Sequence, residues 1–184
     1  MSSRAAGLEV RSAKRAEAPL LATLMQSYLA EFATFETVEK DSDGRYIYPY
    51  FDYYWEDPNR YPFLIRVAGE IAGFALLRFE ADPLTGESVM HLAEFFIVES
   101  FRRRGLGTAA AEYLWNLFPG RWSLGVLKSN RNAYPFWKQA IAGYTGNYTE
   151  QGPAEAIGGA YTFTFMSAVE AELPDDVDPE VFDF

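Results

Sequence analysis

Residues 95–108 read Phe-Phe-Ile-Val-Glu-Ser-Phe-Arg-Arg-Arg-Gly-Leu-Gly-Thr. The first four residues are apolar and predict a buried strand, and the two glycines predict a turn that opens a helix. In such a strand–turn–helix unit the backbone N–H groups of residues 104–108 point outward at a helix N-terminus, where the helix dipole favours anions. Three arginines add positive charge, so the stretch predicts a phosphate-binding loop.

Two other phosphate-binding patterns match this loop only in part. A P-loop requires Gly-Lys-Ser/Thr, whereas Gly107-Thr108 lacks the lysine. The spacing Gly105-x-Gly107-x-x-Ala110 matches a dinucleotide fingerprint, which requires an acidic residue about 20 residues further on. Residues 121–130 contain no acidic residue, and hairpins, not a βαβ unit, precede the loop. Both patterns are therefore disfavoured.

The sequence around this loop predicts an α/β domain (α+β in some schemes) with a mixed, mostly antiparallel sheet. Helical spacing of apolar residues predicts helices after the first strand, at residues 108–118, and from about residue 132. Residues 34–62 contain nine aromatics without regular spacing and predict an irregular but packed segment. Gly69-Glu70 is typical of a tight hairpin. Apolar or alternating runs predict strands at residues 8–11, 63–68, 71–79, 88–98, 122–127 and 161–166.

The composition excludes several classes of protein. The chain has 184 residues, a formal net charge of -10, one histidine and no cysteine. We therefore expect one domain and no metal, and we exclude disulfide frameworks and cysteine nucleophiles. No apolar run reaches the roughly 20 residues of a transmembrane helix, and the N-terminus lacks a signal-peptide core. The expected location is cytoplasmic, with no membrane partner.

The negative charge is concentrated at one end of the chain. Seven acidic residues and no basic residue lie in residues 170–184, which predicts a domain over residues 1–169 followed by an acidic tail. Excess negative charge disfavours nucleic acid as a partner, because phosphate affinity comes from lysine and arginine.

The pattern Arg102-x-x-Gly105-x-Gly107, after an apolar strand and at the start of a helix, resembles the acyl-CoA pyrophosphate loop of the GNAT superfamily of N-acetyltransferases. The order of the predicted elements and the stretch Asn130-x-x-Ala133-x-x-Phe136-Trp137 are also similar to that superfamily. The resemblance implies a GNAT-like sheet of about six to seven strands, flanked by about four helices and splayed at the acyl-CoA site. The start of the loop and the Phe-Trp pair resemble an uncharacterised bacterial branch of predicted acetyltransferases.

The resemblance implies acetyl-CoA as the cosubstrate and transfer of its acetyl group to a primary amine by direct attack in a ternary complex. A main-chain N–H near Phe95 would polarise the thioester carbonyl. The implied cofactor-binding positions are the backbone of Phe95, Phe96 and Ile97 for pantetheine, then Arg102, Arg103, Arg104, Gly105, Leu106, Gly107 and Thr108 for the pyrophosphate, and Asn130 and Trp137 on the pantetheine side.

An ammonium group must lose a proton before its nitrogen attacks, and the resemblance offers two acceptors on the predicted central strand. Glu94 and His91 stand at positions where members of the superfamily carry a base, and water is a third route. In a regular strand His91, Phe95 and Ile97 share one face and Glu94 points to the other, although a bulge would reverse this locally.

The family often protonates the departing thiolate with a tyrosine on the last helix, and Trp137 occupies that position here. An indole N–H is not a usable acid. Either the thiolate leaves as such or with water, or Tyr134 or Tyr144 substitutes. The same departure from the pattern keeps open a second function, that of a noncatalytic acyl-CoA-binding sensor.

The first helix and the aromatic segment are expected to line the acceptor side, with Glu31, Tyr53, Tyr54 and Trp55 as candidate binding residues. Aromatic faces and carboxylates attract cations. The expected acceptor is therefore a small-molecule amine, such as a polyamine or an aminoglycoside-like amine, or a protein or peptide amine. A homodimer is compatible with the resemblance.

Overall fold

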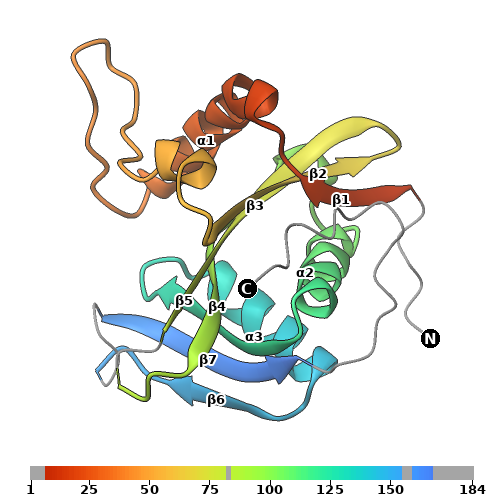
Figure 1. The fold of residues 1–184 in the computed structure, drawn as a ribbon. Coiled ribbons are helices and arrows are strands. Elements are labelled where there is room, and N and C mark those ends of the chain that lie inside the picture. Colours follow the sequence, from red (N-terminus) through yellow and green to blue (C-terminus); the bar gives the residue numbers. More distant parts are fainter. Residues whose placement is uncertain (1–6, 82–83, 155–158, 168–184) are drawn as a thin grey trace.

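The chain is organised around one seven-stranded sheet, seen in a computed structural model that describes residues 7–81, 84–154 and 159–167. The strands are arranged in the order β1-β2-β3-β4-β5-β7-β6 (Figure 1), and only the β4–β5 pair is parallel. The predicted acidic tail lies outside the described residues. The strands are β1 (Leu8–Ser12), β2 (Arg60–Val67), β3 (Glu70–Ala81), β4 (Ser88–Ile97), β5 (Gly120–Leu127), β6 (Tyr148–Gln151) and β7 (Ala160–Ser167).

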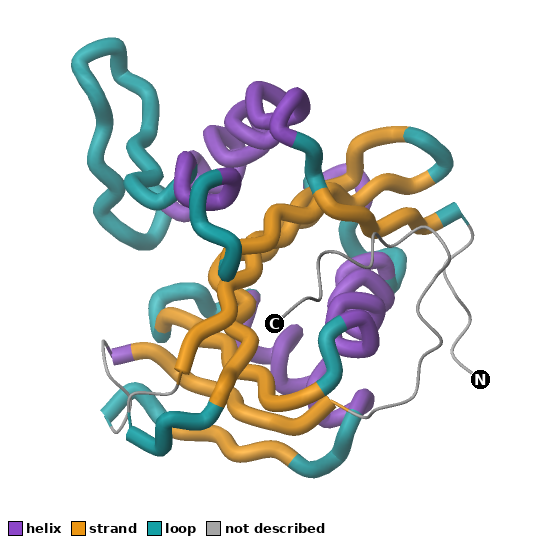
Figure 2. Tube along the Cα trace, viewed as in Figure 1, coloured by secondary structure: helices purple, strands orange, loops and turns teal. Residues whose placement is uncertain are grey.

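Three α-helices cover the sheet in the part of the chain that the structure describes, as the apolar spacing predicted, whereas the resemblance implied about four. They are α1 (Ala18–Phe32), α2 (Leu106–Leu117) and α3 (Ala133–Tyr144). The segment after α1 forms a long loop that projects beside that helix (Figure 2), with only the short 3₁₀ helix η2 (Asp52–Trp55) in it. None of the described helices is long and apolar enough to span a membrane.

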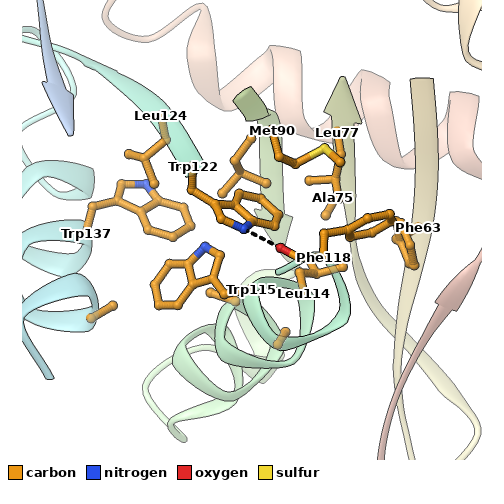
Figure 3. Close-up of a cluster of buried hydrophobic side chains, with 14 of the residues drawn as sticks. Phe63, Ala75, Leu77, Met90, Leu114, Trp115, Phe118, Trp122, Leu124 and Trp137 are labelled. Carbon is orange, nitrogen blue, oxygen red and sulfur yellow. Dashed lines mark hydrogen bonds between the residues drawn. The ribbon is translucent and has the colours of Figure 1, made fainter. Parts of the chain in front are cut away.

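The larger hydrophobic core lies between the sheet and helices α2 and α3 (Figure 3). Trp115 from α2 and Trp122 from β5 are fully buried there, and Trp137 from α3 packs against them. The indole N–H of Trp122 donates to the carbonyl oxygen of Phe118 at 2.8 Å, so burial of this ring leaves no polar atom unpaired. This core fixes α2 and α3 on one face of the sheet.

A second core lies on the opposite face, under α1. The helix buries Leu21, Leu24, Met25 and Leu29 against Phe74 and other residues of the central strands. Those four positions follow helical spacing, which is why an amphipathic helix forms here. Thus α1 lies on one side of the central strands, and α2 on the other.

The hairpin between β2 and β3 turns one residue earlier than the sequence predicted. Its two central residues are Ala68 and Gly69, with φ values of 50° and 82°, and Val67 pairs with Glu70. Two successive positive φ values are typical of a type I′ turn, which matches the twist of the flanking strands.

Strands β4 and β5 pair only over residues 90–92 of β4 and 122–124 of β5. Beyond Leu92 and Leu124 no further ladder pairs join these two described strands. The sheet is therefore splayed between their carboxyl ends, as the resemblance implied, and the β4 edge from Glu94 to Ile97 faces an open side.

A β-bulge in β4 overturns the expected alternation of its side chains. Leu76 pairs with Glu94 but Leu77 pairs with Leu92, so Ala93 is the extra residue. An extra residue reverses the side-chain alternation on one side of the bulge. His91 and Glu94 consequently share the face that carries α1, while Phe95 and Ile97 contribute to the α2–α3 face.

Candidate active site

The loop predicted to bind phosphate has the backbone geometry of an anion site. Arg103 and Gly105 both have positive φ, at 59° and 74°, and Gly105 is the N-cap of α2. No side chain caps that end of the helix, so the first backbone N–H groups of α2 have no intrahelical partner. Unpaired N–H groups and the positive end of the dipole favour an anion at this position.

Gly107 lets α2 approach α3 closely. A Cβ atom at this position would lie 3.1 Å from Cζ of Phe136 and 3.7 Å from Cγ1 of Ile97. The second glycine of the loop therefore brings the helix N-terminus, the end of β4 and the first turn of α3 together.

The three arginines of the loop have different surroundings. The Nε of Arg102 donates to the carbonyl oxygen of Ile97 at 2.6 Å, and its Nη2 lies 2.7 and 2.8 Å from the two carboxylate oxygens of Glu31. Arg103 and Arg104 are exposed, and the guanidinium of Arg104 lies 6.0 Å from the ring centre of Phe101. Arg103 and Arg104 are thus the arginines whose side chains are available at the anion site.

The open edge of β4 presents the backbone of Phe95 and Ile97. The N–H of Val98 donates to Ala72 on β3 at 2.8 Å, and Phe96 pairs with Phe74 in the same register. Because backbone groups alternate in direction along an antiparallel pair, those of Phe95 and Ile97 point away from β3, toward the splayed side. The Ile97 carbonyl already accepts a hydrogen bond from Arg102. The backbone groups that remain for a ligand at this edge are the N–H and carbonyl of Phe95 and the N–H of Ile97.

The predicted residues of α3 have three separate environments. Asn130 accepts a hydrogen bond from the N–H of Ala133 at 3.1 Å and so supports the start of the helix. Trp137 is buried, with its ring centre 5.1 Å from that of Phe95. Tyr134 instead donates to Glu150 on β6 at 2.6 Å, and this bond is the largest cause of its raised pKa. The hydroxyl of Tyr134 is therefore directed to the β6–β7 side of the sheet.

Glu94 is a partly buried carboxylate beside the open edge. The hydroxyl of Tyr28 on α1 donates to its Oε2 at 2.5 Å. Burial raises the pKa of Glu94, hydrogen bonding from Tyr28 and Tyr48 lowers it, and so does the charge of Arg78; the pKa remains above its ordinary value. A carboxylate with a raised pKa accepts a proton more readily than an exposed one does.

His91, the other candidate base, lies earlier on the same face of β4. Its Nε2 is 3.1 Å from Oε1 of Glu80, which belongs to the neighbouring strand β3. The structure therefore places both candidate bases on the face that carries α1, with Glu94 alongside the splayed part of β4 and His91 where β4 and β5 are still paired.

The residues expected to bind a cationic acceptor mostly contact cations of the chain itself. Glu31 pairs with Arg102. Tyr54 is 2% exposed and Tyr53 is 49% exposed, and both rings lie under the guanidinium of Arg60, at 5.3 and 5.6 Å. Trp55 is partly buried, 5.6 Å from the guanidinium of Arg15. The aromatic segment is packed, as predicted, with several rings on the core under α1, but cations of the chain itself lie over the rings of Tyr53, Tyr54 and Trp55.

Sequence reasoning missed two residues that contact Glu94. Tyr28 belongs to the apolar stripe of α1, where its spacing indicates only core packing. Tyr48 lies in a segment without periodicity. A tyrosine hydroxyl directed at a carboxylate on a distant strand leaves no local signal in the sequence. Among the described residues, no group of three or more His, Cys, Asp or Glu side chains could hold a metal ion.

Comparisons with known proteins agree with this geometry. Residues 22–144, more than half of the chain, match the family described as "Acetyltransferase (GNAT) family". No match was found among curated proteins.

Solved structures of acetyltransferases have the same fold. The chain is similar to an acetyltransferase from Thermus thermophilus, with 18% identity, a TM-score of 0.65, and coverage of 89% of this chain and 99% of that one. It is also similar to spermidine N-acetyltransferase from Vibrio cholerae in complex with CoA and spermine, with 13% identity, a TM-score of 0.59, and coverage of 88% and 96%. A third is an aminoglycoside acetyltransferase from an uncultured soil metagenomic sample, with 14% identity, a TM-score of 0.54, and coverage of 73% and 87%. The chain belongs to the GNAT family of acetyltransferases.

Proposed function

We propose that the protein transfers an acetyl group from acetyl-CoA to a primary amine by direct attack in a ternary complex. The observation that carries the proposal is the position of Glu94, a partly buried carboxylate with a raised pKa beside the open edge of β4. Family membership supports acyl-CoA-dependent acetyl transfer, and the residues present fit acyl-CoA.

The phosphate loop and the β4 edge supply the features that acyl-CoA needs. The uncapped N-terminus of α2 and the exposed Arg103 and Arg104 suit a pyrophosphate. The N–H and carbonyl of Phe95 and the N–H of Ile97, which point away from β3, suit the amide groups of pantetheine. The Phe95 N–H can donate to the oxygen that becomes negative when the thioester carbonyl is attacked.

Glu94 acts as the general base in this scheme. It removes a proton from the acceptor ammonium, and the neutral nitrogen then attacks the thioester carbon. The carbon–nitrogen bond forms, the carbon–sulfur bond breaks, and the electron pair leaves on sulfur. The nitrogen, positively charged after the attack, releases its second proton to water and becomes a neutral amide. Because the chain has no cysteine, transfer runs directly to the amine and not through an acyl-cysteine.

The leaving thiolate does not require an acid from α3. A thiol has a pKa of about 8.5, so a thiolate is a tolerable leaving group near neutral pH. Tyr134 is bonded to Glu150, and Tyr144 donates to Asn116 at 2.7 Å, so both tyrosine hydroxyls are already engaged elsewhere. We infer that sulfur leaves as the thiolate or takes its proton from water.

The proposed acceptor is a small-molecule amine or a protein or peptide amine that approaches from the face of α1. Two of the similar structures are named for spermidine and aminoglycoside acetylation. The Arg60 guanidinium over Tyr53 and Tyr54 already occupies the faces that would attract a polycation. We therefore place the acceptor nitrogen at Glu94 itself, not at the aromatic cluster.

Calorimetry with acetyl-CoA tests the cosubstrate. Wild type should bind, and Gly105→Glu should weaken binding at least tenfold, because it puts a carboxylate at the helix N-terminus. Gly44→Glu is the matched control, since Gly44 has a similar φ of 78° and no atom within 4 Å of a built Cβ. Absence of binding by wild type, or equal binding by all three proteins, would contradict the proposal.

The second candidate function is a noncatalytic acyl-CoA sensor, favoured by Trp137 at the position where the family often carries its acid. The two functions differ in turnover. A sensor binds acetyl-CoA but releases no free thiol when amines are added, whereas an acetyltransferase releases thiol in proportion to the amine consumed.

A further inference from the structure

Tyr28 is fixed so that its hydroxyl reaches Glu94. Its ring packs against three other aromatic rings, with centre-to-centre distances of 5.7 Å to Phe32, 5.8 Å to Phe74 and 5.8 Å to Phe96. These contacts come from α1, β3 and β4, so the ring cannot turn without disturbing the core under α1. Packing of the Tyr28 ring therefore fixes the 2.5 Å hydrogen bond from its hydroxyl to Oε2 of Glu94.

Tyr48 is brought to the same carboxylate by a different anchor. The side-chain amide of Gln26 on α1 donates to the carbonyl of Tyr46 at 2.8 Å and accepts from its N–H at 2.9 Å. This two-point attachment holds the loop after α1 against the helix, two residues before Tyr48. Tyr48 is half-buried in the core under α1, and its hydroxyl is the second hydrogen-bonding group that favours the charged form of Glu94.

The charged and titratable groups that influence Glu94 come from each element packed around it. Burial alone favours the protonated carboxyl. Tyr28 from α1, Tyr48 from the loop and Arg78 from β3 all favour the carboxylate. Tyr54 from η2 lies in the same core as Tyr48, and its buried hydroxyl has no hydrogen-bond partner among the described residues. A carboxylate without these donors would be protonated more readily and could not accept a proton from an ammonium.

We propose that Tyr28 and Tyr48 are positioning residues that hold the Glu94 carboxylate charged and oriented for proton transfer from the acceptor amine. This inference rests on the proposed function, in which Glu94 is the general base. The proton moves from the amine nitrogen to a carboxylate oxygen, while the tyrosine hydroxyls keep their own protons. Neither tyrosine touches the reacting atoms.

The test uses Tyr28→Phe, which removes only the hydroxyl and keeps the ring that packs against Phe74 and Phe96. The dependence of kcat on pH is measured at saturating acetyl-CoA and a saturating acceptor amine, together with acetyl-CoA affinity by calorimetry. Loss of a donor that favours the carboxylate raises the pKa of Glu94, so the acid limb of kcat should move to higher pH. At pH values on the acid limb, kcat of Tyr28→Phe should be lower than kcat of wild type by on the order of tenfold.

Three further variants separate the outcomes. Tyr48→Phe should move the acid limb in the same direction. Tyr148→Phe removes a hydroxyl from β6 at the far edge of the sheet and should leave the acid limb of kcat at its wild-type pH. If Glu94→Gln is inactive but the pH profile of kcat is unchanged in both Tyr28→Phe and Tyr48→Phe, the inference is overturned. If Glu94→Gln is as active as wild type, the assignment of the base itself has failed.

Discussion

Arg102 and Glu31 join the phosphate loop to α1 through a two-point ion pair, with Nη2 of the arginine 2.7 and 2.8 Å from the two carboxylate oxygens. The same arginine donates to the Ile97 carbonyl, and its guanidinium lies 5.4 Å from the ring centre of Phe96. The first arginine of the loop therefore links the end of β4 to α1. Arg103 and Arg104 are the loop arginines whose side chains stay exposed.

Replacing Glu31 by glutamine should change stability only slightly. The side chains of Glu31 and Arg102 are 48% and 37% exposed, and an exposed ion pair contributes about 0–1 kcal/mol. Urea unfolding should place Glu31→Gln within about 1 kcal/mol of wild type, with a smaller difference at high salt. A loss of several kcal/mol would mean that the pair is a main support of α1.

Arg103→Ala should weaken acetyl-CoA binding by about 1–3 kcal/mol, the range for a lost charge-assisted contact. The reason is that Arg103 is exposed at the helix N-terminus, whereas Arg102 is already paired. Calorimetry at low and moderate salt measures the change. Equal affinities of Arg103→Ala and wild type would indicate that backbone N–H groups alone hold the anion.

Gly107→Ala should be less stable than Gly143→Ala by about 1–3 kcal/mol, because the new methyl group overpacks a tight contact while both substitutions gain the same helix propensity. The new Cβ would meet Cζ of Phe136 at 3.1 Å. Gly143→Ala is the matched control, since Gly143 also lies inside an α-helix and nothing lies within 4 Å of a Cβ built there. Equal unfolding midpoints for the two variants would show that the ring of Phe136 moves aside freely.

The ion pair of Glu17 predicts a pH-dependent part of the stability. Hydrogen bonding from Arg11, the largest cause, lowers the pKa of Glu17 to about 2, whereas an unfolded chain has a glutamate pKa of about 4.3. A lowered pKa stabilises the fold above the unfolded value, and that stability is lost as the pH falls toward 2. The difference in unfolding free energy between wild type and Glu17→Gln should therefore shrink between about pH 5 and pH 2. A constant difference across this range would contradict the assignment.

Most of the fold follows from local patterns in the sequence. The glycines after an apolar strand correctly predicted the start of α2 within two residues, and the spacing of Leu21 to Leu29 predicted α1. Strand β6 was missed because it has only four residues, Tyr148–Gln151, and forms at the edge of the sheet by pairing with β7. Such a short strand depends on its neighbour more than on its own propensity.

The arrangement around the candidate base could not be predicted in the same way. The bulge at Ala93 depends on how β3 and β4 pair, and no residue in the stretch marks it. The bulge places Glu94 on the face of Tyr28, so the surroundings of the candidate base follow from tertiary packing. The sequence correctly predicted that the aromatic segment is packed. It did not predict that Arg60 lies over the rings of Tyr53 and Tyr54, because the partners of Arg60 depend on the fold.

The proposed role of Glu94 in acetyl transfer is tested most directly by amine-dependent release of free thiol from acetyl-CoA, compared between wild type and Glu94→Gln. The affinity for acetyl-CoA is measured on the same samples. Wild type should release thiol only when an acceptor amine is present. Glu94→Gln should lose about 100-fold or more of that rate while it binds acetyl-CoA as tightly as wild type. Tight binding of acetyl-CoA by wild type without amine-dependent release, or full activity of Glu94→Gln, would contradict the proposed role.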